Sequence, residues 1–137
     1  MEPTKQYEKA IQALTKTTEQ NLYDNKILYK DFICDLEKER DLIEQRIIKK
    51  ENADLKRLED ELQKESNKIF GLYQINRIKE KAKRDLYDND LKYTNLIRDF
   101  KNEQETIEQE MIKKKNADLK ALKNQIQKNI DDLFTKE

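Results

Sequence analysis

Turn-forming residues are almost absent from this chain. Its 137 residues include a single glycine, Gly71, and a single proline, Pro3. Sheets, and folds that alternate strands with helices, need many tight turns, and glycine and proline supply the backbone geometry of those turns. Long helices need neither residue in their interior. The sequence therefore predicts an all-α protein made of long helices.

The apolar residues follow a helical period. Charged residues make up 42% of the chain and hydrophobic residues 35%, which suffices for a narrow apolar stripe but not for a broad core. Disordered chains share the high charge but lack regular apolar spacing. Here the apolar positions advance by three and four residues, with polar interruptions at Arg40, Glu51, Gln104 and Lys115. The pattern predicts coiled-coil-like packing with an imperfect heptad.

The sequence also repeats itself. When it is aligned with itself at an offset of 64, Asn21–Phe70 matches Asp85–Phe134 without a gap, and 23 of the 50 positions are identical. Internal similarity of this kind is typical of a tandem duplication. We therefore predict two helical repeats, repeat 1 at residues 1–64 and repeat 2 at residues 65–137, which together form one continuous elongated helical domain.

Gly71 is the predicted position of a turn or kink, because glycine costs about 1 kcal/mol in a helix interior. The favoured architecture is an elongated helical hairpin folded at Gly71, or a helix kinked there. In that hairpin Tyr29 would lie opposite Ile112. A continuous helix remains an alternative, and so do compact three-helix units whose helices end at Asp24-Asn25 and at Lys49–Asn52, and at the matching positions of the second repeat.

Several polar residues are the same in both repeats, although core packing does not require it. One interpretation is that each repeat presents the same surface to a protein partner, and the other is a duplication that has not yet diverged. The candidate partner-binding residues are Glu44, Gln45, Lys49, Lys50, Asn52 and Lys56, with Glu108, Gln109, Lys113, Lys114, Asn116 and Lys120 at the matching positions.

A basic segment lies between the repeated blocks. Arg77, Lys79, Lys81, Lys83 and Arg84 form a candidate basic patch that could meet an acidic protein surface or phosphates. A solvated helical face is the favoured interpretation. The formal net charge is zero and no aromatic residue interleaves the segment, so nucleic acid is not an expected partner.

The residues needed for most site chemistry are missing. The chain has no histidine, one cysteine and one glycine, so a zinc site, a Cys–His nucleophile and a glycine-rich phosphate loop are excluded. We expect no metal, no cofactor and no enzymatic activity. Cys34 corresponds to Arg98 in the second repeat and is therefore expected to face solvent, whereas Tyr29, Tyr93, Phe100 and Phe134 are expected in the packed stripe.

The chain shows neither a secretory h-region near Met1 nor a run of 18 apolar residues, which predicts a cytoplasmic protein without a membrane span. We expect a structural coiled-coil scaffold that binds protein partners through helical faces within a larger assembly, such as a cytoskeletal or filamentous one, and homo-oligomers remain open. The alternative is a soluble helical adaptor or effector that binds and regulates one protein target.

Overall fold

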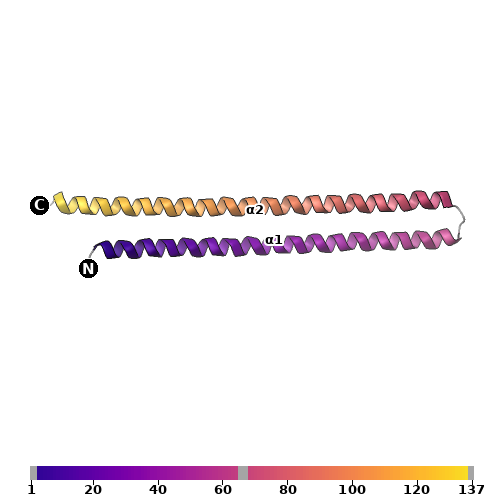
Figure 1. Ribbon diagram of the computed structural model, residues 1–137, viewed down its shortest axis with the longest axis horizontal. Helices are drawn as coiled ribbons and strands as arrows, with labels where there is room; N and C mark the ends of the chain where they lie inside the picture. The colour runs from indigo at the N-terminus through magenta and orange to yellow at the C-terminus, as the bar shows by residue number, and fades with distance from the viewer. Residues whose placement is uncertain (1–2, 65–67, 136–137) are drawn as a thin grey trace. The chain divides into compact units, whose positions relative to one another are not determined.

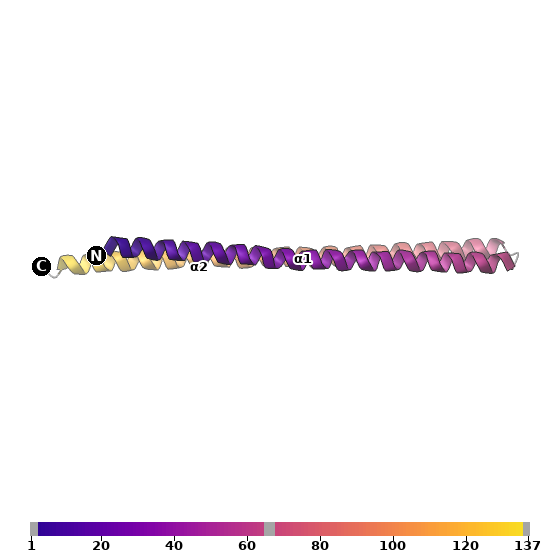
Figure 2. The ribbon, with the colours of Figure 1, turned by 90° about the horizontal axis from the view of Figure 1, so that it is seen from below.

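The computed structural model describes residues 3–64 and 68–135. These residues form two helices, α1 (Pro3–Lys64) and α2 (Lys68–Thr135), and the described part of the chain contains no strand (Figure 1). The two helices pack against each other as a helical hairpin (Figure 2). The predictions of an all-α fold and of a hairpin are therefore confirmed.

The hairpin divides into two compact units, each with one segment of α1 packed on one segment of α2. The terminal unit comprises Met1–Asp31 and Lys101–Glu137, and the central unit comprises Phe32–Phe100. Each unit therefore combines residues from both sequence repeats. Every contact described below lies within one of these units.

The predicted turn at Gly71 is wrong. α2 begins at Lys68 and continues through Gly71, which is buried and has no positive φ. A Cβ atom on Gly71 would lie only 2.5 Å from Cδ1 of Leu62 in α1. The glycine thus serves close approach of the two helices rather than a turn. The connection itself falls on residues 65–67, outside the described residues.

The predicted register of the hairpin is also wrong, because it was centred on Gly71. In the terminal unit, Tyr29 interacts with Glu103 and not with Ile112. In the central unit, the rings of Phe32 and Phe100 lie 5.7 Å apart between centroids. Both pairs require a connection several residues before Gly71.

The three-helix alternative is excluded by the continuity of both helices. α1 runs without interruption through Asp24-Asn25 and Lys49–Asn52, and α2 does the same at the matching positions of the second repeat. Asparagine after basic residues can end a helix, but no glycine or proline follows at these places to force an end.

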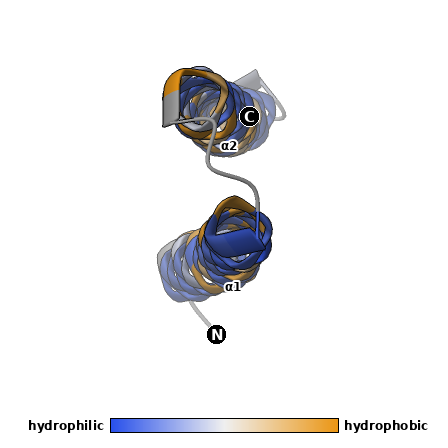
Figure 3. Ribbon diagram, turned by 90° about the vertical axis from the view of Figure 1, so that its right-hand side faces the viewer, coloured by the Kyte–Doolittle hydropathy of each residue, from blue (hydrophilic) through white to orange (hydrophobic). Residues whose placement is uncertain are grey.

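The packed stripe is narrow, as the composition requires. Among the described residues, only Tyr29, Leu58, Ala82 and Tyr93 are buried hydrophobic residues. Figure 3 shows hydrophilic residues over most of both helices. Along α1 from Leu14 to Leu62, the buried and half-buried positions of successive turns are four residues apart more often than three. Their mean spacing therefore exceeds the 3.5 residues of a strict heptad.

Candidate protein-binding strips

A buried polar cluster joins the helices of the central unit. The side-chain amide of Asn89 donates a hydrogen bond to the backbone carbonyl of Arg40 at 3.1 Å. One turn away, Tyr93 is only 2% exposed and its hydroxyl is hydrogen-bonded with Glu39. Burial raises the pKa of Tyr93, and the hydrogen bond and charge of Glu39 raise it further. These contacts tie α2 to α1 through polar atoms.

The terminal unit contains the same cluster, made by the residues 64 positions away. Asn25 donates to the backbone carbonyl of Gln104 at 3.3 Å, and Tyr29, 5% exposed, is hydrogen-bonded with Glu103. Burial is again the main cause that raises the pKa of Tyr29, followed by the charge of Glu103 and then its hydrogen bond. In both units, a tyrosine and an asparagine from one repeat therefore meet residues of the other repeat.

These clusters are structural rather than catalytic in character. Among the described residues, every buried side-chain nitrogen and oxygen has a hydrogen-bond partner within the protein. A buried asparagine in a helix pair instead favours one register over its alternatives. The polar interruptions of the stripe at Arg40 and Gln104 coincide with these contacts, because their backbone carbonyls accept the hydrogen bonds of the two asparagines.

The sequence interpretation missed this role of Asn25 and Asn89, which it considered as helix breaks. A signal was present: Leu22, Asn25 and Tyr29 follow the three-and-four spacing of the stripe, and all three are identical in the second repeat. Polar residues that occupy stripe positions in both copies indicate buried hydrogen bonds rather than helix ends.

Most of the candidate partner-binding residues lie on exposed strips. The first strip belongs to α1 in the central unit and the second to α2 in the terminal unit, and all their residues are exposed. The first strip consists of Gln45, Ile48, Lys49, Asn52 and Lys56, and the second of Gln109, Ile112, Lys113, Asn116 and Lys120.

The helical period places each strip on the outer side of its helix. Between Ile47 and Leu58 in α1, the half-buried or buried positions are Ile47, Glu51, Asp54, Leu55 and Leu58. Strip residues fall between them at steps of three and four and therefore share the opposite side. Each strip includes an exposed isoleucine, Ile48 at 40% and Ile112 at 42% in the other strip.

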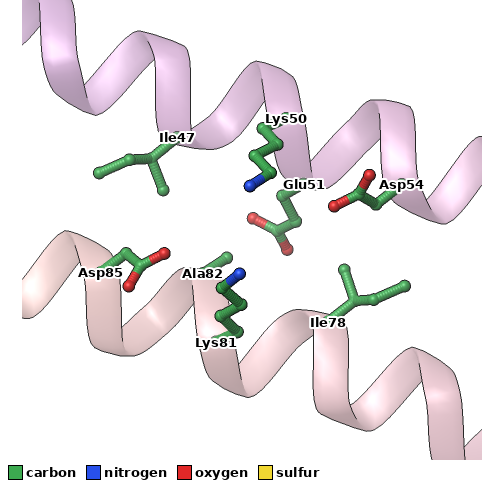
Figure 4. Close-up of a pocket in the computed structure, with 8 residues that line it drawn as sticks. All are labelled: Ile47, Lys50, Glu51, Asp54, Ile78, Lys81, Ala82 and Asp85. Atoms are coloured by element: carbon green, nitrogen blue, oxygen red, sulfur yellow. The ribbon is translucent and has the colours of Figure 1, made fainter.

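The remaining candidates lie beside the strips. Glu44, Lys50 and Lys114 are exposed, and Glu108 is half-buried. Lys50 lines a cavity of about 70 Å³ between α1 and α2 in the central unit, together with Lys81 of the basic segment (Figure 4). The structure thus brings one predicted partner-binding residue next to one residue of the predicted basic patch.

This cavity is too small for an organic ligand. Binding pockets for such ligands span roughly 300–1,000 Å³, whereas about 70 Å³ holds a few waters. Its lining includes the carboxylates of Glu51, Asp54 and Asp85, with Ala82 leaving the space open (Figure 4). In the described part of the chain, no group of carboxylates or cysteine is arranged to hold a metal ion.

The basic segment does not form one patch. Arg77, Lys81 and Arg84 share one side of α2 at steps of four and three, while Lys79 and Lys83 share another. All five are exposed. The guanidinium of Arg77 also lies 5.9 Å from the ring centroid of Tyr73, as a cation–π pair within the same helix. The segment therefore resembles a solvated helix surface more than a phosphate-binding site.

Comparison with family models, with curated proteins and with solved structures found no match. Neither described helix has a stretch apolar enough to cross a membrane. Cys34 is exposed, as predicted, whereas Phe134 is 75% exposed and does not join the packed stripe.

Proposed function

We propose that this protein is a non-catalytic helical scaffold that binds protein partners through its two strips. The observation that carries the proposal is that five exposed residues, including an isoleucine, are identical on the outer side of both repeats. Exposed residues away from the helix interface have no packing role that would keep them the same. A repeated surface of this kind is suited to a partner that is itself repeated.

The pattern of differences between the repeats supports a functional origin of the strips. At many other exposed positions the repeats differ, as at Cys34 and Arg98, Lys38 and Asn102, and Leu42, which is a threonine in the second repeat. A young duplication would leave identities scattered over the exposed surface. Exposed identities also occur elsewhere, as at Tyr23, Asp24 and Gln63, but they are densest in the segment that carries the strip.

The small core gives a physical reason for binding. A pair of helices buries only the side that each turns to the other, so large apolar residues such as Ile48, Leu42 and Ile112 remain exposed. Burying apolar surface contributes roughly 25 cal/mol per Å². A partner helix that packs on a strip would cover its isoleucine, while the strip lysines contact polar groups of the partner.

The test compares the two strips in one pull-down from native extract with the full chain immobilised. One variant carries Ile48→Ser and Lys49→Glu, and its counterpart carries Ile112→Ser and Lys113→Glu. Equal losses of a partner recovered at more than one copy per chain are expected. Loss with only one of the two variants, at one partner per chain, would instead indicate the adaptor role.

A matched control is available beside the first strip. Arg46 is exposed and differs from Glu110 in the second repeat, so Arg46→Glu reverses a charge next to the strip by introducing the residue that the second repeat already has. This control should keep full partner recovery. If Arg46→Glu reduces recovery as much as the strip variants do, the binding depends on general charge and the proposed strips are wrong.

A further inference from the structure

A second exposed surface is repeated in the chain, and its charge is opposite to that of the strips. In the terminal unit, α1 exposes Tyr23, Asp24, Ile27 and Asp31, which we call the acidic face. Tyr23 is 59% exposed. The side-chain amide of Gln20 donates a hydrogen bond to the Asp24 carboxylate at 2.9 Å and holds it on this side of the helix.

The central unit carries a matching acidic face on α2. Tyr87, Asp88 and Leu91 stand 64 positions after their counterparts and are exposed as well, Tyr87 at 66%. Asn95 replaces Asp31, so this face has one carboxylate fewer. In the central unit Arg84, the counterpart of Gln20, stands one turn before Asp88, so this face is the less acidic of the two. Each unit therefore exposes an aromatic face with a carboxylate on one helix and a basic strip on the other.

The acidic face of the terminal unit and the strips have the same residue spacing. Asp24 and Asp31 are seven residues apart, as are Lys49 and Lys56, and an apolar residue directly precedes the first charge in both sets. Seven residues span about 10.5 Å along a helix. Two carboxylates on one helix can therefore meet two lysines on another at the same time.

We propose that the partner of the strips is a second copy of this chain, whose acidic face docks on the basic strip. This inference rests on the proposed function, because it names the partner of the same strips. Within the described residues, the strip lysines form no ion pair, so their charges are available to a partner. Tyr23 and Tyr87 then lie against Ile48 and Ile112 and supply the apolar contact.

The predicted association is weak at each site. Exposed ion pairs contribute little individually and are screened by salt. Since every chain has two faces and two strips, more than one such contact can form per chain. Self-association is therefore expected to depend on protein concentration and to decrease as salt is raised.

Sedimentation velocity of the full chain tests the inference by reversing charges on either surface. One variant carries Lys49→Glu and Lys113→Glu on the strips, and the other carries Asp24→Lys and Asp88→Lys on the acidic faces. Each variant alone should self-associate at least roughly 10-fold more weakly than the wild type. An equimolar mixture of the two should associate again, because the intact acidic faces of the strip variant can dock on the intact strips of the other variant, and the reversed charges are complementary as well.

The control changes net charge equally without touching either surface. Arg77→Glu with Lys79→Glu, both at least eight residues before Tyr87, alters the same number of charges as the strip variant and should self-associate like the wild type. Circular dichroism of each variant verifies that the helices are intact. A monomeric wild type at low salt and high concentration overturns the inference, and so does a mixture that fails to associate or a control that weakens association as much as the strip variant.

Failure of self-association can be told apart from failure of the scaffold proposal. If the wild type is monomeric but the strip variants still lose a partner from extract, the second-copy inference is wrong and the scaffold proposal stands. If neither assay responds to the strip residues, both are wrong.

Discussion

The terminal and central units share their buried polar contacts and differ around them. Each unit has an asparagine donating to a backbone carbonyl and a buried tyrosine beside a glutamate. The terminal unit also has an open groove of about 570 Å³, lined in part by Ala10, Ala13 and Ala121. The matching positions of the central unit hold Gln74, Arg77 and Arg57, which are long polar residues.

The difference shows which contacts the hairpin depends on. Side chains beside the helix interface differ in size and charge between the two units, yet α1 and α2 pack against each other in both. The asparagine, tyrosine and glutamate did not change. Because each asparagine and tyrosine meets residues of the other repeat, one repeat cannot complete its own cluster within the hairpin.

The ends of the units also differ. In the central unit, Gly71 lies against Leu62 near the helix connection. The residue 64 positions before Gly71 is Tyr7, near the start of α1 in the terminal unit, and its hydroxyl accepts a hydrogen bond from Asn129 at 2.6 Å. A close backbone contact in one unit thus corresponds to a bulky aromatic contact in the other.

The largest effects are expected from removing the buried tyrosines. Tyr93→Ala and Tyr29→Ala each empty a packed site and should lower the midpoint of thermal unfolding by roughly 10 °C, as followed by circular dichroism. Amide hydrogen exchange should increase mainly in the unit that carries the change. The exposed tyrosines serve as controls, and Tyr87→Ala and Tyr23→Ala should shift the midpoint by less than about 2 °C.

Similar losses at Tyr93 and Tyr29 would show that the two clusters are equivalent. A large loss at Tyr93 with none at Tyr29 would contradict this and show that the terminal unit depends on other contacts, such as that between Tyr7 and Asn129.

A smaller effect is expected at alkaline pH. The pKa values of Tyr29 and Tyr93 are raised above the usual 10.0, mainly by burial, so the folded state holds these protons more tightly than the unfolded state. Their contribution to stability is complete below the unfolded pKa and is lost as pH rises through the folded pKa. Urea unfolding measured on both sides of pH 10 should therefore show a decrease on the alkaline side.

Single tyrosine-to-phenylalanine variants show how much each unit contributes to this pH dependence of stability. Tyr29→Phe and Tyr93→Phe each remove one titrating hydroxyl, and each should make the alkaline decrease less steep than in the wild type. Lysine deprotonation contributes equally to all three proteins and cancels in the comparison. If both variants keep the wild-type steepness, the two hydroxyls are not the groups that titrate.

The sequence predicted the helices and the hairpin but not its register. The scarcity of glycine and proline and the three-and-four spacing were sufficient for the all-α fold, since both act locally along the helix. The register depends on contacts between residues far apart in the chain, such as Asn89 with the carbonyl of Arg40. Gly71 misled the prediction because glycine favours both turns and close helix contacts.

The candidate strips could be located from sequence only as part of a longer block. Their identity in both repeats was visible, and it singled out Lys49 and Asn52. Without burial, however, outer and inner positions could not be separated, so Ile48 was not recognised as exposed and Lys50 was grouped with the strip.

The smallest effect is expected at Gly71, where α2 lies close to Leu62 of α1 in the central unit. Gly71→Ala improves helix propensity by about 1 kcal/mol, but the new methyl group would meet the end of the Leu62 side chain, at 2.5 and 2.7 Å from its two Cδ atoms. Leu62 is half-buried and can rotate, at a cost of about 0.5–1.5 kcal/mol if it leaves its preferred rotamer. The two terms nearly cancel, so the net change in the free energy of unfolding should be below about 0.5 kcal/mol.

A double-mutant cycle with Leu62→Ala separates the two terms. In that background the contact with the leucine side chain is gone, and Gly71→Ala should stabilise the hairpin by about 1 kcal/mol in urea unfolding. The coupling between the two positions then measures how closely α1 and α2 approach in the central unit. A Gly71→Ala effect that is the same with and without Leu62 would show that the two residues do not touch, and the glycine would then have no packing role to distinguish this unit from the one that carries Tyr7.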